Sequence, residues 1–258
     1  MSELYFLGTG GSVATPERDN TSLLLKLGQT FILVDCSGSV IQKIRKLNFN
    51  PIQVESILIT HIHPDHVYGL PSFVHSLMLE ESLVRLYGSE ETIEFCRKLL
   101  DLFRLMREEI KIRVEFVSLM PGENVNLNDS LVIKALEVPH SSSSLAFHLF
   151  FKEEQKELVY SGDTPAHSSL FQEAEGKDYL IHDCSAPSRF FDKYPSLHTM
   201  HTHSLRLGKL SQEARVKCLI PCHFFGELEY SLSEIEEEIR QNYRGRLIIP
   251  KDLEKITI

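Results

Sequence analysis

The sequence predicts an α/β protein in which mixed strands are covered by helices. Short apolar runs with strand character recur along the chain, and segments with helical periodicity are interleaved with them. The chain has 258 residues, of which 42% are hydrophobic, enough to bury a sizeable core. No linker or break in composition divides it, so we expect a single domain over residues 1–258.

The N-terminal elements follow from local signals. The apolar run 4–7 predicts a strand that ends in the glycine-rich turn 8–12. Two short strands are expected at 22–27 and 30–34, because Gly28-Gln29 interrupts them as the turn of a hairpin would. The chain therefore opens with a strand, a flexible turn and a hairpin.

Helical periodicity appears in two clear places and sets the pattern for the rest. Residues 39–47 place Val40 and Ile44 on one helical face, and 89–107 begin with Ser89 as N-cap. Further strands are expected at 56–59, 83–87, 112–117, 131–138, 145–151, 157–160, 179–183 and 217–221. Further helices are expected at 66–79, 204–214 and 231–242.

Composition excludes several classes of protein. No apolar run approaches the roughly 18 residues that a membrane span requires, and no secretion signal is recognised at the start. The net charge of −9, from 36 acidic and 27 basic residues, argues against a dedicated nucleic-acid surface. The five cysteines form no C-x-x-C pair, which is typical of a reducing cytoplasm. We expect a cytoplasmic protein that does not enter a membrane.

The stretch THIHPDH, residues 60–66, concentrates metal-ligating side chains at the end of a strand. His61 and His63 are two positions apart, so at strand spacing both rings point the same way. Asp65 and His66 follow where the chain turns into a helix. Imidazole nitrogens and carboxylate oxygens are ligands of zinc-like ions, and four such ligands in six residues exceed the needs of one tetrahedral ion. Two neighbouring ions would resolve this crowding.

Three more ligand-capable side chains follow predicted strands elsewhere. His140, Asp163 and His223 each come directly after an apolar strand or its turn. Any one of them alone would more often serve a structural hydrogen bond. Together with the cluster at 60–66, they favour a metal site at one edge of the sheets.

These residues resemble the signature of the metallo-β-lactamase-fold hydrolases, which is T-H-x-H-x-D-H followed by a separate His, Asp and His. The resemblance implies a four-layered αββα sandwich and two divalent metal ions, zinc in the first place with manganese or iron as alternatives. It also implies that a hydroxide bridging the ions is the nucleophile. By the resemblance, one ion is held by His61, His63 and His140, and the second by Asp65, His66 and His223, with Asp163 bridging them. Asp65 counts among both the catalytic residues and the ligands.

The opening LGTGGS at 7–12 is similar to the ribonuclease Z group and its phosphodiesterase relatives. That group also carries a His-Glu-Ala-Thr and a later His-Ser-Thr segment, which correspond here to the surroundings of Asp183 and His201. The resemblance implies that His201 is the general acid and Asp183 its orienting partner, although Asp is one methylene shorter than the family's Glu. His203 is the fallback acid, with a helix-start or surface role as its alternative.

The spacing of two ligands bears on the substrate. Enzymes of this group that process transfer RNA usually carry a long arm between the isolated His and the bridging Asp, whereas His140 and Asp163 are only 23 positions apart here. Binding of a polyanion also depends on Lys and Arg contacts, which suits the acidic chain poorly. We therefore expect a small-molecule or short nucleotide phosphodiester substrate, including cyclic nucleotides, and disfavour transfer RNA.

Candidate substrate contacts are fewer. Ser141 and Ser142 follow His140 and could offer hydroxyls to a phosphate, or could belong to a solvated turn. Phe190 lies in the segment 184–203, which has little regular pattern and is expected to form either a functional lid or packing against the core or a partner subunit. The family resemblance implies a homodimer.

Two other functional classes stay open, beside transfer-RNA 3′-processing by a ribonuclease Z proper. The first is a lactone or thioester hydrolase on the same fold. The second is a metal-binding module without turnover, for which a missing ligand would be expected, yet all seven ligand positions are occupied.

Overall fold

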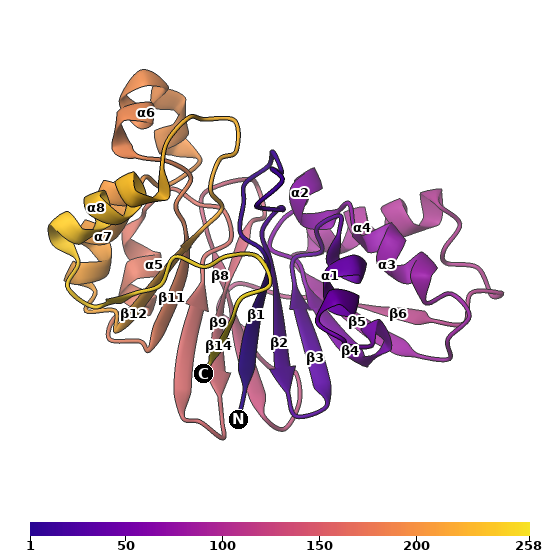
Figure 1. The fold of residues 1–258 in the computed structure, drawn as a ribbon. Coiled ribbons are helices and arrows are strands. Elements are labelled where there is room, and N and C mark those ends of the chain that lie inside the picture. Colours follow the sequence, from indigo (N-terminus) through magenta and orange to yellow (C-terminus); the bar gives the residue numbers. More distant parts are fainter. The chain divides into compact units, whose positions relative to one another are not determined.

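The computed structural model describes residues 1–258 and divides into two compact units. Unit 1 comprises residues 1–9, 16–120 and 251–258, and unit 2 comprises residues 10–15 and 121–250. Each unit contains one seven-stranded mixed sheet with helices beside it, as Figure 1 shows. The α/β class is therefore confirmed. The expectation of a single domain concerns how the units are joined, and it stays a prediction.

The sheet of unit 1 begins antiparallel and continues parallel. Its strand order is β14-β1-β2-β3-β4-β5-β6. The bounds are β1 Glu3–Gly8, β2 Ser22–Leu27, β3 Thr30–Val34, β4 Val54–Leu58, β5 Leu83–Gly88, β6 Arg113–Ser118 and β14 Lys255–Thr257. Pairs from β14 to β3 are antiparallel, whereas β3 to β6 are parallel. The change occurs where helices replace hairpin turns as connections, because parallel neighbours require a crossover.

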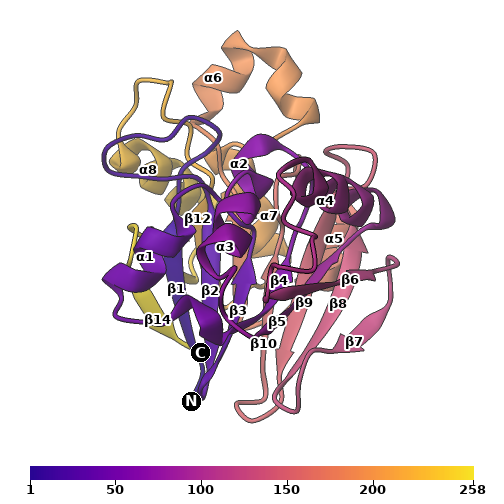
Figure 2. The ribbon, with the colours of Figure 1, turned by 90° about the vertical axis from the view of Figure 1, so that its right-hand side faces the viewer.

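Helices of unit 1 pack on one face of this sheet, where α1, α3 and α4 lie in Figures 1 and 2. The bounds are α1 Val40–Lys46, the 3₁₀ helix η1 Pro51–Gln53, α2 Pro64–Val67, α3 Leu70–Ser76 and α4 Glu90–Leu102. The Ser89 hydroxyl caps α4 by accepting the N–H of Thr92. The single helix expected at 66–79 is wrong. A Cβ at Gly69 would lie 1.9 Å from the Ser37 carbonyl oxygen, so the chain turns there at close quarters.

The sheet of unit 2 repeats this plan. Its order is β13-β12-β11-β10-β9-β8-β7, antiparallel from β7 to β10 and parallel from β10 to β13. The bounds are β7 Asn124–Asn126, β8 Leu131–Glu137, β9 Leu145–Phe151, β10 Lys156–Tyr160, β11 Tyr179–Asp183, β12 Cys218–Cys222 and β13 Arg246–Leu247. The expected strands at 131–138, 145–151, 157–160, 179–183 and 217–221 are confirmed to within a residue or two.

The helices of unit 2 include three segments that periodicity did not predict, at 168–173, 188–193 and 195–199. The bounds are α5 Ser168–Glu173, α6 Ser188–Lys193, the 3₁₀ helix η2 Pro195–Thr199, α7 Ser204–Glu213 and α8 Leu232–Asn242. The expectation of little regular structure over 184–203 is wrong, because α6 and η2 occupy most of it. Phe190 and Phe191 of α6 pack with Ala186 in a small separate core, which supplies the burial that makes so short a helix stable. No helix of the protein is long and apolar enough to span a membrane.

Candidate metal centre

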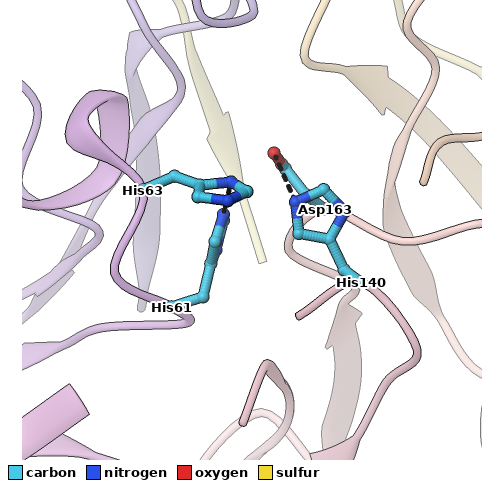
Figure 3. Close-up of side chains that lie close together, drawn as sticks. All are labelled: His61, His63, His140 and Asp163. Atoms are coloured by element: carbon cyan, nitrogen blue, oxygen red, sulfur yellow. Dashed lines mark hydrogen bonds and ion pairs between the residues drawn. The ribbon is translucent and has the colours of Figure 1, made fainter. Parts of the chain in front are cut away.

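The ligand candidates of unit 1 lie between β4 and the end of α2. His63 is the N-cap of α2 and Pro64 its first residue, so the chain turns from strand to helix within the motif. Nε2 of His61 and Nδ1 of His63 are 2.9 Å apart (Figure 3). Two nitrogens on one tetrahedral zinc would be roughly 3.3 Å apart for Zn–N bonds of about 2.0 Å. The two rings therefore converge on one point at a spacing near that of shared ligands.

The second pair of unit 1 is oriented by a residue that the sequence analysis missed. Nδ1 of His66 lies 2.9 Å from Oδ2 of Asp35, and the His66 side chain is fully buried. The backbone N–H and hydroxyl of Thr60 donate to Oδ1 of Asp35 at 2.8 and 3.0 Å, which holds the carboxylate. With its Nδ1–H donated to Asp35, His66 presents the Nε2 lone pair, as metal-binding histidines do. Oδ2 of Asp65 is 3.4 Å from this Nε2.

A signal for Asp35 was present in the sequence. It follows directly after the apolar strand β3, the same pattern that singled out His140, Asp163 and His223. Its backbone φ of 57° is left-handed, a conformation that Asp adopts more readily than most residues.

The ligand candidates of unit 2 lie where its strands end. Asp163 follows β10 through Gly162, and its Oδ2 lies 3.0 Å from Nε2 of His223 and 3.8 Å from Nε2 of His140. Figure 3 includes the His140–Asp163 pair. Nδ1 of His140 donates to the Met200 carbonyl at 2.8 Å, which directs Nε2 towards the carboxylate. Burial lowers the pKa of His140, so its neutral, metal-binding form predominates.

Asp183 and His201 form a buried pair beside these ligands. Nδ1 of His201 lies 2.8 Å from Oδ2 of Asp183, and the two residues are 9% and 2% exposed. Asp183 also accepts the Ser185 hydroxyl at 2.6 Å and the Thr164 N–H at 3.2 Å. These bonds hold the carboxylate although its side chain is one methylene shorter than glutamate. The ring of His201 stacks on that of His223 at a centroid distance of 5.3 Å.

His203 is placed differently from His201. It is the N-cap of α7, where its Nδ1 accepts the N–H of Arg206 at 3.2 Å. Phe191 packs edge-on against its ring. The ring thus has a structural role at the helix start, the alternative that the sequence analysis left open.

The proposed substrate contacts are not gathered at one surface. The Ser141 and Ser144 hydroxyls bond to each other at 2.6 Å, whereas Ser142 is exposed. Phe190 is buried between the Tyr230 ring and the Arg189 guanidinium. Their assignment as substrate-binding residues stays a prediction.

The donor set fits divalent metal ions. The His and Asp side chains in both units offer one ring nitrogen or carboxylate oxygen each, and most of them are buried. Nitrogen and oxygen donors of this kind suit zinc and neighbouring transition metals. In both units the outer nitrogen of a histidine is held by an acceptor, the buried Asp35 carboxylate or the Met200 carbonyl, which is typical of ligands around an ion.

Comparison with known proteins shows which family the chain is similar to. A sequence model of the family described as anti-Pycsar protein Apyc1 matches residues 2–235. Ribonuclease Z of Pyrococcus abyssi is 30% identical over 309 positions, covering 100% of this chain and 96% of the relative. Ribonuclease Z of Methanosarcina mazei is 24% identical over 310 positions, covering 100% and 98%. The metallo-β-lactamase fold protein YhfI from Bacillus subtilis superposes with a TM-score of 0.84 at 18% identity, with 100% of both chains covered.

The chain is therefore a ribonuclease Z-like, metal-dependent hydrolase of the phosphodiesterase type with the metallo-β-lactamase fold. Within that class it belongs to the family described as anti-Pycsar protein Apyc1. The predicted family resemblance and fold are confirmed.

Proposed function

We propose that the protein is a dinuclear metal-dependent phosphodiesterase that hydrolyses small or cyclic nucleotide-type phosphodiesters. The observation that carries this proposal is the Asp183–His201 pair next to His140, Asp163 and His223. It supplies a proton donor beside candidate metal ligands, and hydrolysis of a phosphodiester with an alkoxide leaving group needs both.

The candidate ligands of unit 1 and of unit 2, here called the two half-sites, would together bind two metal ions, and zinc fits the donors best. One ion would be held by His61, His63 and His140, and the second by Asp65, His66 and His223, with Asp163 between them. When bound, such ions would lower the pKa of a coordinated water towards neutrality and offset charge on the phosphoryl oxygens. Membership of the family and the donor set of each unit support this assignment.

His201 would act as the general acid. Its Nδ1–H is donated to Asp183, so the proton that reaches the leaving oxygen comes from Nε2. The buried carboxylate fixes this orientation and stabilises the imidazolium before transfer, as in other Asp–His pairs. This arrangement suits an alkoxide or ribose hydroxyl, which is a poor leaving group unless protonated.

The connection between His140 and Asp163 supports a small substrate. Between these ligands lie the turn 141–144, the hairpin of β9 and β10 with its short turn at 152–155, and residues 161–162, so no RNA-gripping arm is inserted there. The alignments with the curated relatives extend over 304 to 317 positions, so those relatives carry segments without counterpart in this chain of 258 residues. The second candidate is transfer-RNA 3′-processing, which the names of these relatives favour.

A substrate panel tests the proposal. The purified protein is analysed for bound metals and assayed with bis(p-nitrophenyl) phosphate, a 3′,5′-cyclic nucleotide, a precursor transfer RNA and an acyl-homoserine lactone. We expect bound divalent ions and a preference for the small phosphodiesters. A preference for the lactone would contradict the proposal, efficient precursor cleavage would favour the second candidate, and bound ions without any turnover would indicate a metal-binding module.

The variant His201→Ala separates acid catalysis from metal binding. We expect turnover to fall by roughly 10²–10⁴-fold, the usual contribution of a general acid, while the metal content stays unchanged. The matched control is His75→Ala, since His75 is an exposed histidine of α3 outside the candidate site. Unchanged turnover in His201→Ala would move the role of acid to His203 or show that no general acid is needed. The homodimer and the cytoplasmic location expected from the sequence stay predictions.

A further inference from the structure

A pocket of about 290 Å³ adjoins the candidate acid in unit 2. It lies where η2 ends and α7 begins, and it is lined by Ala166, His198, His201, Thr202, His203 and Arg206. None of these residues is a proposed metal ligand. His201 is therefore the one residue that the pocket shares with the proposed catalytic and metal-binding residues. It is also the residue that would touch the leaving oxygen.

The position of His201 indicates which part of the substrate would lie next to the pocket, namely the fragment that leaves. Its ring packs against the rings of His140 and His223, with centroids 5.1 and 5.3 Å away. Its Nδ1 is held by Asp183, so Nε2 is the nitrogen that would meet the leaving oxygen. A fragment attached to that oxygen lies beside His201, where this pocket opens.

The polar groups of the pocket are donors and cations. Nδ1 of His203 accepts the backbone N–H of Arg206, so in the neutral ring the proton resides on Nε2, which is then a donor. The Arg206 guanidinium is exposed and forms no salt bridge. The ring of Phe191 packs edge-on against the rings of His198 and His203, whose centroids lie 5.2 and 5.0 Å from its own.

No carboxylate lines this pocket, although the chain has a net charge of −9. The acidic groups that act on His203 are Glu238 and Asp192. Glu238 accepts hydrogen bonds from the hydroxyls of Ser188 and Ser204, so its oxygens are bonded to these serines and do not line the pocket. Asp192 is exposed to solvent, where its field is screened. The pocket thus remains suited to an anion.

The volume of the pocket limits the size of the ligand that it can bind. Sites for small molecules commonly measure roughly 300–1,000 Å³, and this pocket lies just below that range. It suits a phosphate group with a short attachment rather than an extended polynucleotide. A guanidinium with adjacent N–H donors is a common way to bind phosphate.

We propose that the pocket of His198, His203 and Arg206 is a subsite for a second phosphate carried by the leaving fragment. This inference rests on the proposed phosphodiesterase function and adds a substrate preference to it. In the reaction, water supplies the new oxygen on phosphorus, the bond to the leaving oxygen breaks, and His201 protonates that oxygen. The second phosphate is bound in the pocket and is chemically unchanged.

Phosphate binding is tested directly on the full-length protein as purified. Inorganic phosphate is titrated while the C2-proton NMR resonances of His198 and His203 are followed. We expect both resonances to shift in the wild type and in Lys209→Gln. In Arg206→Gln the phosphate affinity obtained from these shifts should be at least about tenfold weaker. Lys209 is the matched control, because it is an exposed cation on α7 outside the pocket.

Substrate preference supplies the second test. Dithymidine monophosphate is compared with its two derivatives that carry one added phosphate, at the 5′ or at the 3′ end. We expect one derivative to show a kcat/KM about tenfold higher than the parent. Arg206→Gln should lower the kcat/KM of that derivative about tenfold more than that of the parent, which abolishes the preference.

The outcomes separate the two proposals. Turnover of all three dinucleotides without preference overturns the subsite while leaving the phosphodiesterase intact. If none of the three is cleaved but the 3′,5′-cyclic nucleotide is, the subsite is overturned and the phosphodiesterase stands. Turnover of neither the dinucleotides nor the cyclic nucleotide and bis(p-nitrophenyl) phosphate contradicts the phosphodiesterase. An equal phosphate response in Arg206→Gln and Lys209→Gln, or a response to unphosphorylated thymidine alone, also overturns the subsite.

Discussion

Each of the two units contains a buried Asp–His pair, and the proposed roles of the two histidines differ. In unit 1, Asp35 at the end of β3 holds Nδ1 of His66 at 2.9 Å. In unit 2, Asp183 at the end of β11 holds Nδ1 of His201 at 2.8 Å. Both carboxylates are also fixed by a nearby threonine N–H, from Thr60 and Thr164. The local geometry of an Asp–His pair therefore does not decide whether the histidine serves as a ligand or as an acid.

The two histidines, His66 and His201, differ in the residues that surround them. His66 lies beside Asp65, and its ring is 4.2 Å from that of His61, so it belongs to a group of potential ligands. His201 also packs against two candidate ligands, His140 and His223, and its ring additionally lines a pocket that contains no proposed ligand. An imidazole among other donors can hold an ion, whereas one facing a pocket can deliver a proton to what binds there.

The half-sites also differ in how the chain builds them. The candidate ligands of unit 1 all come from residues 61–66, after one strand end and in the short helix α2. Unit 2 draws His140, Asp163 and His223 from three separate connections. Both sheets contain several strand ends. The candidate ligands of unit 2 follow three different strand ends, whereas those of unit 1 all follow one. The comparison can be tested by removing matched residues from each unit.

The largest expected effect comes from removing one aspartate ligand in each unit. Asp65→Ala should retain about one ion per chain, whereas Asp163→Ala should retain less, because Asp163 is proposed to serve both ions. Turnover in Asp163→Ala should fall by roughly 10⁴-fold or more, since two charge stabilisers of about 10²–10³-fold each are lost. Metal analysis and steady-state kinetics measure this.

Circular dichroism provides the control for folding of both variants. If Asp163→Ala kept as many ions as the wild type, the bridging assignment would be wrong, and the units would hold their ions independently.

An intermediate effect should distinguish the two Asp–His pairs. Asp35→Asn should weaken metal affinity by roughly 10–100-fold, because a residue that orients a ligand is altered. Asp183→Asn should leave the metal content unchanged but lower turnover by roughly 10²–10⁴-fold, because the acid loses its orientation. Chelator competition and kinetics on both variants measure the contrast. Equal changes in metal affinity would show that His201 is also a ligand.

The smallest effect concerns the acid stability of unit 2. His182 is fully buried and stacks on Phe171, and burial lowers its pKa from 6.5 to about 4. Between these pH values the unfolded chain binds a proton that the folded chain does not, so the free energy of unfolding falls as pH drops from about 6.5 to about 4. The full loss amounts to roughly 3 kcal/mol.

The variant His182→Gln should remove this contribution. Its free energy of unfolding should therefore depend less steeply on pH than that of the wild type, by up to about 1.4 kcal/mol per pH unit, whatever its absolute stability. Urea unfolding at several pH values measures the slope. Parallel slopes for the two proteins would mean that His182 is charged in the folded state.

Much of the fold was predictable because strand formation depends on local signals. The hairpin of β2 and β3 was predicted from Gly28, whose φ of 63° suits the turn. Predictions failed where long-range packing overrode them. The expected helix 66–79 is divided at Gly69 by the approach of Ser37, and residues 188–193 become helical as their phenylalanines pack in a small core.

The sequence alone determined the ligand types, their order and the local cluster at 60–66, because metal preference follows side-chain chemistry and two-residue spacing follows strand geometry. Only the tertiary structure decided which acceptors orient the histidines. Asp35 lies 31 positions from His66, and the Met200 carbonyl lies 60 positions from His140. Such hydrogen bonds form between segments that packing brings together, and no local periodicity encodes that meeting.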